Sequence, residues 1–191
     1  MLEPLLVSTG VVALAEIGDK TQLLALLLAA RFRKPLPIIL GILVATLANH
    51  ALAGFVGSWI AAQVGPTVMR WVLGLSFLAM AAWILVPDKV DDDEGAATAG
   101  RFGVFGSTVV AFFLLEMGDK TQIATVALAA RYDSLAMVVA GTTLGMMLAN
   151  VPAVLLGQVA ATKLPLGIVR SIAAALFAVL GVAVLLSVGQ G

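Results

Sequence analysis

The chain has 191 residues, of which 61% are hydrophobic and only 12% are charged, and its formal net charge is zero. This composition excludes an ordinary soluble domain, which needs more polar surface, and favours a bundle of membrane helices with the lipid bilayer as its partner. The balanced charge leaves no basic face for nucleic acid. The lack of cysteine excludes disulfides and thiolate metal sites.

Six apolar segments are each long enough to cross a bilayer, which takes roughly 20 helical residues. They cover about 5–30, 38–62, 67–87, 103–130, 134–160 and 166–188, with short polar or proline-containing joints between them. Because residues 1–4 lack the positive charge of a secretory signal, we expect the first segment to remain as a span. The joint at 88–100 is acidic and then rich in glycine and alanine, which predicts a solvated linker.

The distribution of positive charge predicts the orientation of the spans. Outside the spans' central charged motifs, seven Lys and Arg residues fall on one side of the predicted bundle and two on the other. Positive residues concentrate in cytoplasmic loops. We therefore expect a multi-pass protein of the inner (plasma) membrane, with the linker 88–100 in the cytoplasm and both termini outside it.

The chain contains an internal repeat with an offset of 100 residues. Without gaps, 13–32 matches 113–132 at 11 of 20 positions, and the register continues to Arg70 and Arg170. Each unit carries three spans, an odd number, so the second unit enters the membrane in the opposite sense. The prediction is an all-α polytopic membrane protein with six transmembrane helices as an inverted-topology 3+3 repeat, common among secondary transporters. Its parts are 1–87 (first repeat), 88–100 (cytoplasmic linker) and 101–191 (second repeat).

The repeat is best matched where charged residues lie about halfway along two spans. The first motif reads EIGDKTQ (Glu16–Gln22) and the second EMGDKTQ (Glu116–Gln122). Ionised groups at that depth cost about 2.5–3.5 kcal/mol each, so they should face the bundle interior, be paired and serve a function. The glycine before each aspartate, Gly18 or Gly118, predicts a local break in the helix whose freed carbonyls join the site.

The side chains of the two motifs predict a site for a divalent cation. Four carboxylates and two ammonium groups leave a formal charge of −2, which one divalent cation balances. Oxygen ligands suit Mg²⁺, Ca²⁺ or Mn²⁺, whereas a chain with no cysteine and one histidine serves zinc and copper poorly. The predicted metal ligands are Glu16, Asp19, Glu116, Asp119, Thr21, Thr121, Gln22 and Gln122. Lys20 and Lys120 are expected to balance charge, and Asn49, His50 and Asn150 to lie behind the ligands.

A site that holds a cation between four acids also predicts what happens when the cation leaves. Four carboxylates in an apolar interior should not all stay charged, so protons are expected to take the cation's place. The pattern therefore predicts a cation:proton antiporter. Ion pairs within each motif, such as Glu16–Lys20, are a purely structural alternative, but they leave Asp19 and Asp119 without a role.

Two copies of the pattern E-x-G-D-K/R-T/S in mirrored spans resemble the manganese/calcium cation:proton exchanger family. Here the copies run from Glu16 to Thr21 and from Glu116 to Thr121 without departure from the pattern, and the resemblance covers nearly the whole chain. That family includes Golgi manganese and calcium transporters, chloroplast manganese carriers and bacterial manganese exporters. The resemblance implies that the acids of both motifs bind the cation, that both threonines support them, and that a chain this short is similar to the manganese exporters.

We therefore expect a secondary transporter, not an enzyme, that exports Mn²⁺, with or without Ca²⁺, in exchange for protons. No cofactor is expected besides the transported cation. The alternatives are a Ca²⁺/H⁺ antiporter, an exporter of small amino acids, an intramembrane hydrolase and a membrane assembly subunit. Both H⁺ and Na⁺ fit as the coupling ion, and a homodimer stays open.

Overall fold

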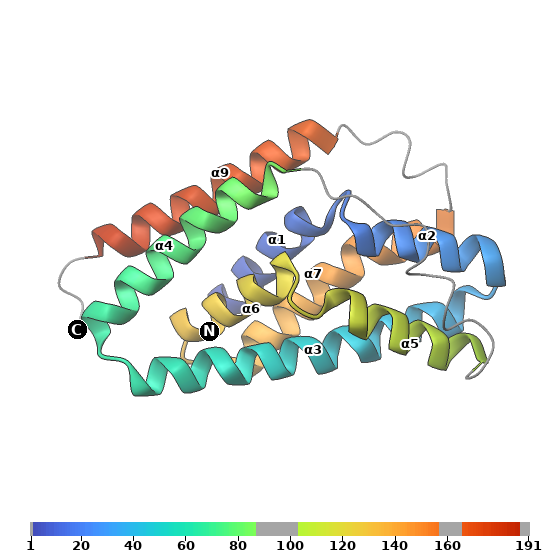
Figure 1. Ribbon diagram of the computed structural model, residues 1–191, viewed down its shortest axis with the longest axis horizontal. Coiled ribbons are helices and arrows are strands. Elements are labelled where there is room, and N and C mark those ends of the chain that lie inside the picture. The colour runs from blue at the N-terminus through green and yellow to red at the C-terminus, as the bar shows by residue number, and fades with distance from the viewer. Residues whose placement is uncertain (1, 87–102, 157–165, 188–191) are drawn as a thin grey trace.

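The computed structural model describes residues 2–86, 103–156 and 166–187, and these form eight helices (Figure 1). The predicted linker 88–100 and the joint at 161–165 lie outside the described residues. The all-helical prediction is confirmed for the described part of the chain. In chain order the helices are α1 (Glu3–Glu16), α2 (Lys20–Phe32), α3 (Pro35–Gln63), α4 (Pro66–Ile84), α5 (Gly103–Glu116), α6 (Lys120–Arg131), α7 (Leu135–Leu156) and α9 (Leu166–Leu186).

Four of the described helices, α3, α4, α7 and α9, are long and apolar enough to cross a membrane. The predicted spans 5–30 and 103–130 differ, because each consists of two shorter helices of 12 to 14 residues. A helix of that length rises only about 20 Å, less than the hydrocarbon core of roughly 30 Å. Only the two helices of such a pair taken together, α1 with α2 or α5 with α6, are long enough to cross the membrane.

The ends of the helices follow from local sequence. Pro35 and Pro66 stand at the first turn of α3 and α4, where the missing N–H of proline costs no hydrogen bond. Arg33 closes α2 in a left-handed conformation with φ of 53°, and its N–H donates to the Ala29 carbonyl at 3.0 Å. The chain thereby reverses from α2 into α3 within a few residues.

Most helix contacts occur in pairs that the 100-residue repeat makes equivalent. Helix α1 packs on α7 as α5 packs on α3, α3 contacts α6 as α7 contacts α2, and α1 meets α6 as α2 meets α5. Phe77 and Phe177, 100 residues apart, touch each other with ring centroids at 6.1 Å and planes at 52°. Equivalent residues of the two halves therefore face each other where α4 and α9 meet.

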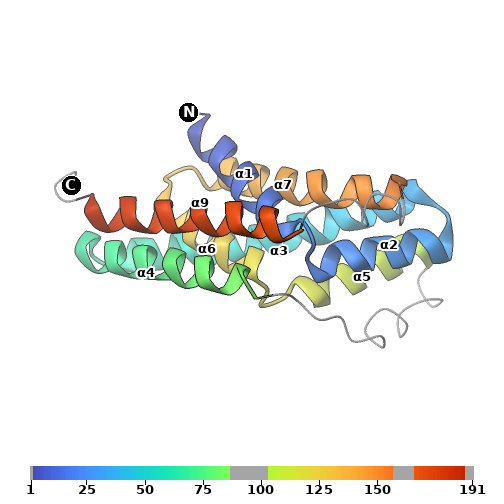
Figure 2. The ribbon, with the colours of Figure 1, turned by 90° about the horizontal axis from the view of Figure 1, so that it is seen from above.

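The antiparallel pair α4 and α9 breaks this equivalence. Helix α4 packs against α6 and α9 against α1, while among the described residues no comparable contacts join α4 to α5 or α9 to α2. Figure 2 shows the pair along one end of the molecule and α2 and α5 at the other. Among the described helices, the pair thus covers one end of the other six and not the opposite end.

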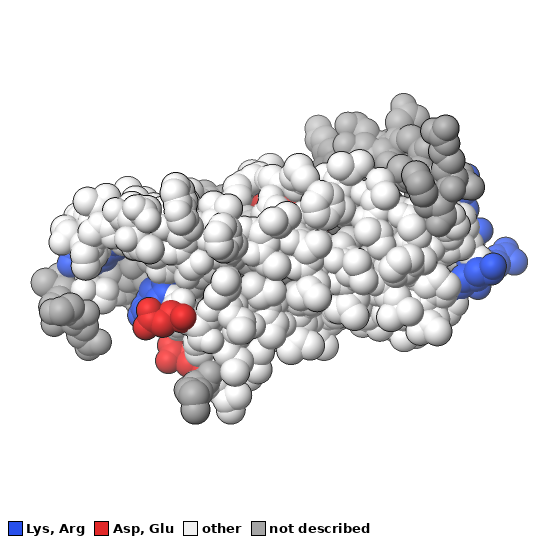
Figure 3. All heavy atoms as spheres, turned by 90° about the horizontal axis from the view of Figure 1, so that it is seen from below, with Lys and Arg blue, Asp and Glu red and all other residues white. Residues whose placement is uncertain are grey.

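Polar and charged side chains lie inside the bundle beside its apolar core, and many large apolar side chains lie on its surface. The buried set includes Glu16, Glu116, Asn49, His50 and Asn150, whereas large apolar side chains such as Leu6, Phe55 and Val179 are more than half exposed. In the face seen in Figure 3, Lys and Arg gather at one end, a mixed charged group lies toward the other, and the middle is almost uncharged. This distribution is the one expected when the surrounding solvent is lipid.

The close crossing of α7 and α1 depends on Gly145. A Cβ at this position lies 2.6 Å from the Thr9 carbonyl oxygen and 2.9 Å from the Ala13 nitrogen, backbone atoms that move only if α1 moves. We expect Gly145→Ala to lower stability by about 1–3 kcal/mol, measured as a lower Tm of the purified protein in detergent. Gly10→Ala on α1 is the control, because its Cβ meets nothing within 4 Å; an equal loss of Tm in both variants contradicts the close packing.

Candidate cation site

Both charged motifs interrupt a helix at the same place. Each glutamate ends one helix and each lysine begins the next. Gly18 and Gly118, between them, have φ of 81° and 80°, in the left-handed region that residues with a Cβ enter only at a cost. The structure therefore places the breaks where the sequence analysis expects them.

The two aspartates are the N-caps of the helices that follow the breaks. Asp19 precedes α2 and accepts a hydrogen bond from the Lys20 N–H at 2.8 Å, and Asp119 precedes α6. The N-terminus of a helix carries a partial positive charge, which stabilises a nearby carboxylate. Both carboxylates are thus buried where a helix end compensates part of their charge.

The two glutamines brace the breaks. The side-chain oxygen of Gln22 accepts a hydrogen bond from the Gly18 N–H at 2.9 Å, and that of Gln122 accepts one from the Gly118 N–H at 2.6 Å. Gln22 also donates from Nε2 to the Ala149 carbonyl of α7 at 3.0 Å. The spacing D-x-x-Q is that of a capping box, a signal present in the sequence that the ligand prediction did not use.

The two glutamates are buried but have different partners. Glu16 is 0% and Glu116 1% exposed. Glu116 accepts a hydrogen bond from the Thr121 hydroxyl of its own motif, whereas Glu16 accepts one from Asn150 Nδ2 of α7 at 3.3 Å. The carboxyl groups of Glu116, Asp19 and Asp119 all lie close enough to the Glu16 carboxyl group to interact with it electrostatically. The acids of the two motifs thus form one electrostatic cluster.

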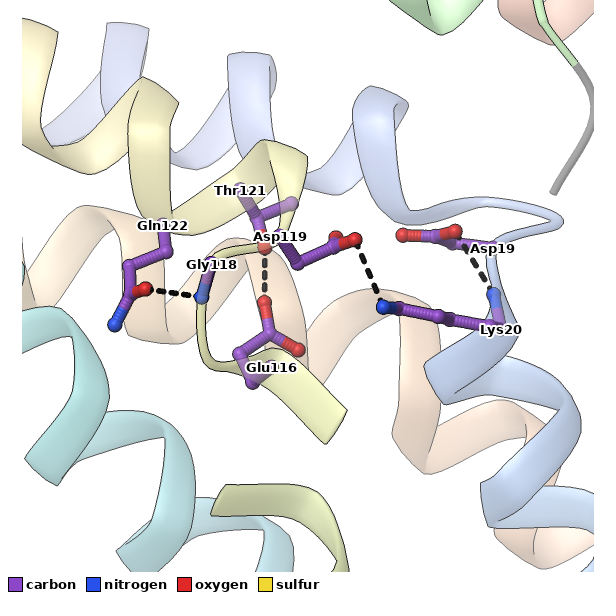
Figure 4. A network of polar contacts seen from close by, with 7 residues as sticks. All are labelled: Asp19, Lys20, Glu116, Gly118, Asp119, Thr121 and Gln122. Atoms are coloured by element: carbon purple, nitrogen blue, oxygen red, sulfur yellow. Dashed lines mark hydrogen bonds and ion pairs between the residues drawn. The ribbon is translucent and has the colours of Figure 1, made fainter. Parts of the chain in front are cut away.

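A lysine joins the two motifs. Lys20 Nζ lies 3.2 Å from Asp119 Oδ1, so its ion pair crosses from one half of the chain to the other instead of staying with Glu16. Figure 4 shows Lys20 reaching from the start of α2 toward Asp119, with the carboxylates of Asp19 and Asp119 directed toward each other. Lys120 is buried, and its ammonium lies 5.9 Å from the ring centroid of Trp83 on α4, within cation–π range.

The remaining predicted residues also lie in the interior. Thr21 is fully buried at the start of α2, and Asn49 of α3 donates from Nδ2 to the Phe113 carbonyl of α5 at 3.0 Å. His50 is fully buried, and neither ring nitrogen has a hydrogen-bond partner among the described residues. No group of three or more Asp, Glu or His side chains in the described part of the chain is arranged to hold a metal ion. In this arrangement, therefore, no three of these acids converge on one point among the described residues.

Arg170, noted above for its place in the repeat, also contacts the first motif. From the start of α9, its Nη2 donates to the Gly18 carbonyl at 3.4 Å, one of the carbonyls that the first break exposes. Sequence gives one signal for it, the arginine at the equivalent position 70. The contact fixes α9 to the first motif.

The second break is more open than the first. Met117 is 55% exposed and Gly118 is exposed, whereas Gly18 is half-buried. A groove of about 240 Å³ runs beside the second motif and is lined by Leu52, Ala53, Val56, Gln122, Ile123 and Val126. The second break is therefore the less covered of the two, although the acids themselves are buried.

An apolar helical bundle with buried acids at paired helix breaks has the architecture of a secondary transporter. The profile of the family described as "Divalent cation/proton antiporter GDT1" matches residues 4–92 and 104–190 of the chain. The chain belongs to this family, whose members are membrane transporters and not enzymes. The resemblance to cation:proton exchangers is thereby confirmed.

Relatives in bacteria and plants support this assignment. A Vibrio cholerae protein named "Putative manganese exporter" is 54% identical over 184 residues, which cover 96% of this chain and 90% of that protein. GDT1-like protein 3 of Oryza sativa subsp. japonica is 28% identical over 93% of this chain and 71% of its own length. A GDT1-like protein of Synechocystis is 28% identical over 80% and 82%. No solved structure matches the chain.

The ion pair between the motifs predicts coupling between two residues distant in sequence. Lys20→Met and Asp119→Asn each leave one charge of this pair without its partner. The stability lost in the double variant should therefore be smaller than the sum of the stabilities lost in the two single variants. Because the Lys20 side chain is 24% exposed, water weakens the pair and the expected coupling is about 1 kcal/mol. Tm values of the four proteins in detergent measure it. Lys34→Met, at an exposed joint, is the control and should combine additively with Asp119→Asn; additivity for Lys20 contradicts the pair.

Proposed function

We propose that this protein exports Mn²⁺ from the cytoplasm in exchange for protons and holds the ion between its two motifs. The observation that carries the proposal is the Lys20–Asp119 pair, which brings the two acid-bearing helix breaks together. Membership of a divalent cation/proton antiporter family supports the ion class, and the name of the Vibrio cholerae relative supports manganese as cargo. Ca²⁺ is proposed as a second, less favoured cargo, because oxygen ligands accept both ions.

Charge balance explains how the site exchanges its contents. Four carboxylates and two lysines carry a formal −2, which one divalent cation or two protons neutralise. The Lys20 ammonium interacts electrostatically with Asp119, Asp19 and Glu116. It therefore occupies a position at which an entering cation would be close to the same carboxylates. A cation that displaces this ammonium takes over both aspartates, and protons restore neutrality once it has left.

The proposed ligands are the carboxylates of the two motifs, with the threonines as support. The glutamines support the site by stabilising the helix breaks, because their side-chain oxygens accept hydrogen bonds from the N–H groups of Gly18 and Gly118. The full set in this proposal is Glu16, Asp19, Glu116, Asp119, Thr21, Thr121, Gln22 and Gln122.

The proposed membrane topology is six spans in two inverted units, 1–87 and 101–191, with α1–α2 and α5–α6 as the two broken spans. The equivalent helix pairings and the Phe77–Phe177 contact support it. The Tyr132 hydroxyl donates to Glu3 Oε1 at 3.3 Å, so the start of α1 and the end of α6 lie at the same end of the bundle. We propose that this end faces away from the cytoplasm and that the linker 88–100 lies in the cytoplasm.

Transport measurements test the cargo, the coupling and the site together. In proteoliposomes with an internal pH dye, Mn²⁺ uptake should be matched by proton efflux. Asp19→Asn and Asp119→Asn should each reduce it by at least about 100-fold, because each removes a charge that balances the cation. The control is Asp133→Asn, an exposed residue in the joint after α6, which should transport like the unchanged protein.

The outcomes of this experiment decide the cargo, the coupling ion and the role of the two motifs. Ca²⁺ uptake faster than Mn²⁺ uptake makes calcium the cargo. Metal uptake that is insensitive to the pH gradient but follows a Na⁺ gradient makes Na⁺ the coupling ion. Full activity of both Asn variants removes the motifs from the site.

Single cysteines test the topology, because the natural chain contains none. Lys34→Cys and Asp133→Cys are exposed at the α2–α3 and α6–α7 joints, which the proposal places on opposite sides of the membrane. A membrane-impermeant maleimide should label Asp133→Cys in intact cells or spheroplasts and Lys34→Cys only after permeabilisation. The reverse pattern inverts the orientation, and equal labelling of both in intact cells contradicts the inverted topology.

A further inference from the structure

Asn150 connects the first motif to a methionine. It lies on α7, is fully buried, and its Nδ2 donates to Glu16 Oε1 at 3.3 Å, to the Met146 carbonyl at 3.1 Å and to Met146 Sδ at 3.0 Å. Met146 is also fully buried. Its sulfur therefore accepts a hydrogen bond from the same amide group that holds the Glu16 carboxylate.

Two oxygens at this place have no hydrogen-bond donor. Among the described residues, neither Asn150 Oδ1 nor Glu16 Oε2 has a partner, and both atoms are buried. A buried acceptor without a donor costs about 1–3 kcal/mol. Carboxylate oxygen, amide oxygen and thioether sulfur are all electron-pair donors, and a cation satisfies such a group where N–H donors are lacking.

The repeat does not duplicate this arrangement. The positions equivalent to Met146 and Asn150, 100 residues earlier, hold Thr46 and His50. Both are buried on α3, which packs against α5 and α6 beside the second motif. The two motifs are nearly identical, yet the helices that face them carry different donor atoms at the equivalent positions: a thioether at Met146 beside the first motif and a hydroxyl at Thr46 beside the second.

We infer that Glu16, Asn150 and Met146 form a cation subsite in which the thioether selects Mn²⁺ against Ca²⁺ and Mg²⁺. This inference rests on the proposed function and names the residue that gives it selectivity. Thioether sulfur is a soft ligand that Ca²⁺ and Mg²⁺, which take oxygen ligands, bind weakly. Mn²⁺ also takes oxygen ligands but, as a transition metal, accepts a softer ligand more readily than these two ions do. Rotation of the Asn150 amide turns Oδ1 toward the ion while Glu16 keeps its place at the end of α1. Carboxylates alone accept all three ions, so sulfur supplies the discrimination.

Competition between metals in proteoliposomes tests the subsite. Met146→Leu keeps the volume and removes the sulfur. Its ratio of Mn²⁺ to Ca²⁺ initial uptake rates should fall about tenfold, and inhibition of uptake by Cd²⁺, a thiophilic ion, should weaken by a similar factor. Met147→Leu is the matched control, because Met147 is the next residue of α7 and packs against apolar side chains; its ratio should equal that of the unchanged protein.

The outcomes separate this inference from the proposed function. If the unchanged protein moves no Mn²⁺, the proposed function fails. If it moves Mn²⁺ and Met146→Leu, folded with a normal Tm, keeps the same metal ratio and Cd²⁺ sensitivity, the subsite is wrong and the function stands. If Met146→Leu does not fold, Met146→Thr, which copies the residue at position 46, gives the same comparison.

Discussion

Carboxylates inside an apolar bundle need stabilisation from the protein itself, because lipid offers no hydrogen bonds. The helix breaks at the two motifs supply part of this stabilisation. The break after Glu16 creates a helix N-terminus for Asp19, and Gln22 satisfies the N–H that the break exposes. The second motif repeats this solution. The cost of burying the acids therefore explains why two predicted spans are built as pairs of short helices.

The two copies of one motif are placed in different surroundings. Glu16 is held by Asn150 of α7, and the first break is covered by Arg170 of α9. Glu116 is held by Thr121 of its own motif, and the second break is exposed. The difference has two causes: position 50 holds His where position 150 holds Asn, and among the described helices α9 packs against α1 whereas α4 packs against α6 instead of the equivalent α5. A duplicated sequence thus yields an asymmetric site.

Local sequence was sufficient to predict that the chain is helical and where two of its apolar segments break, because apolar length and a glycine before a buried aspartate are local signals. It did not give the partner of Lys20. The spacing from Glu16 favours an ion pair only in a continuous helix, the break at Gly18 removes that continuity, and Lys20 pairs with Asp119. Arg170 gave no local signal for its contact with the Gly18 carbonyl, because the two residues belong to different halves of the chain. Features set by adjacent residues, such as the helix breaks, were predictable, whereas contacts between helices distant in the sequence were not.

The pair between Lys20 and Asp119 has a consequence for how such a protein evolves. After an internal duplication, each half can in principle drift on its own. Here the counter-charge for one half is encoded in the other, so a change at either position alters the selection on its partner across the gene. The two halves therefore cannot change independently at these positions, and second-site mutations that restore function after a defect in one motif should map to the other motif.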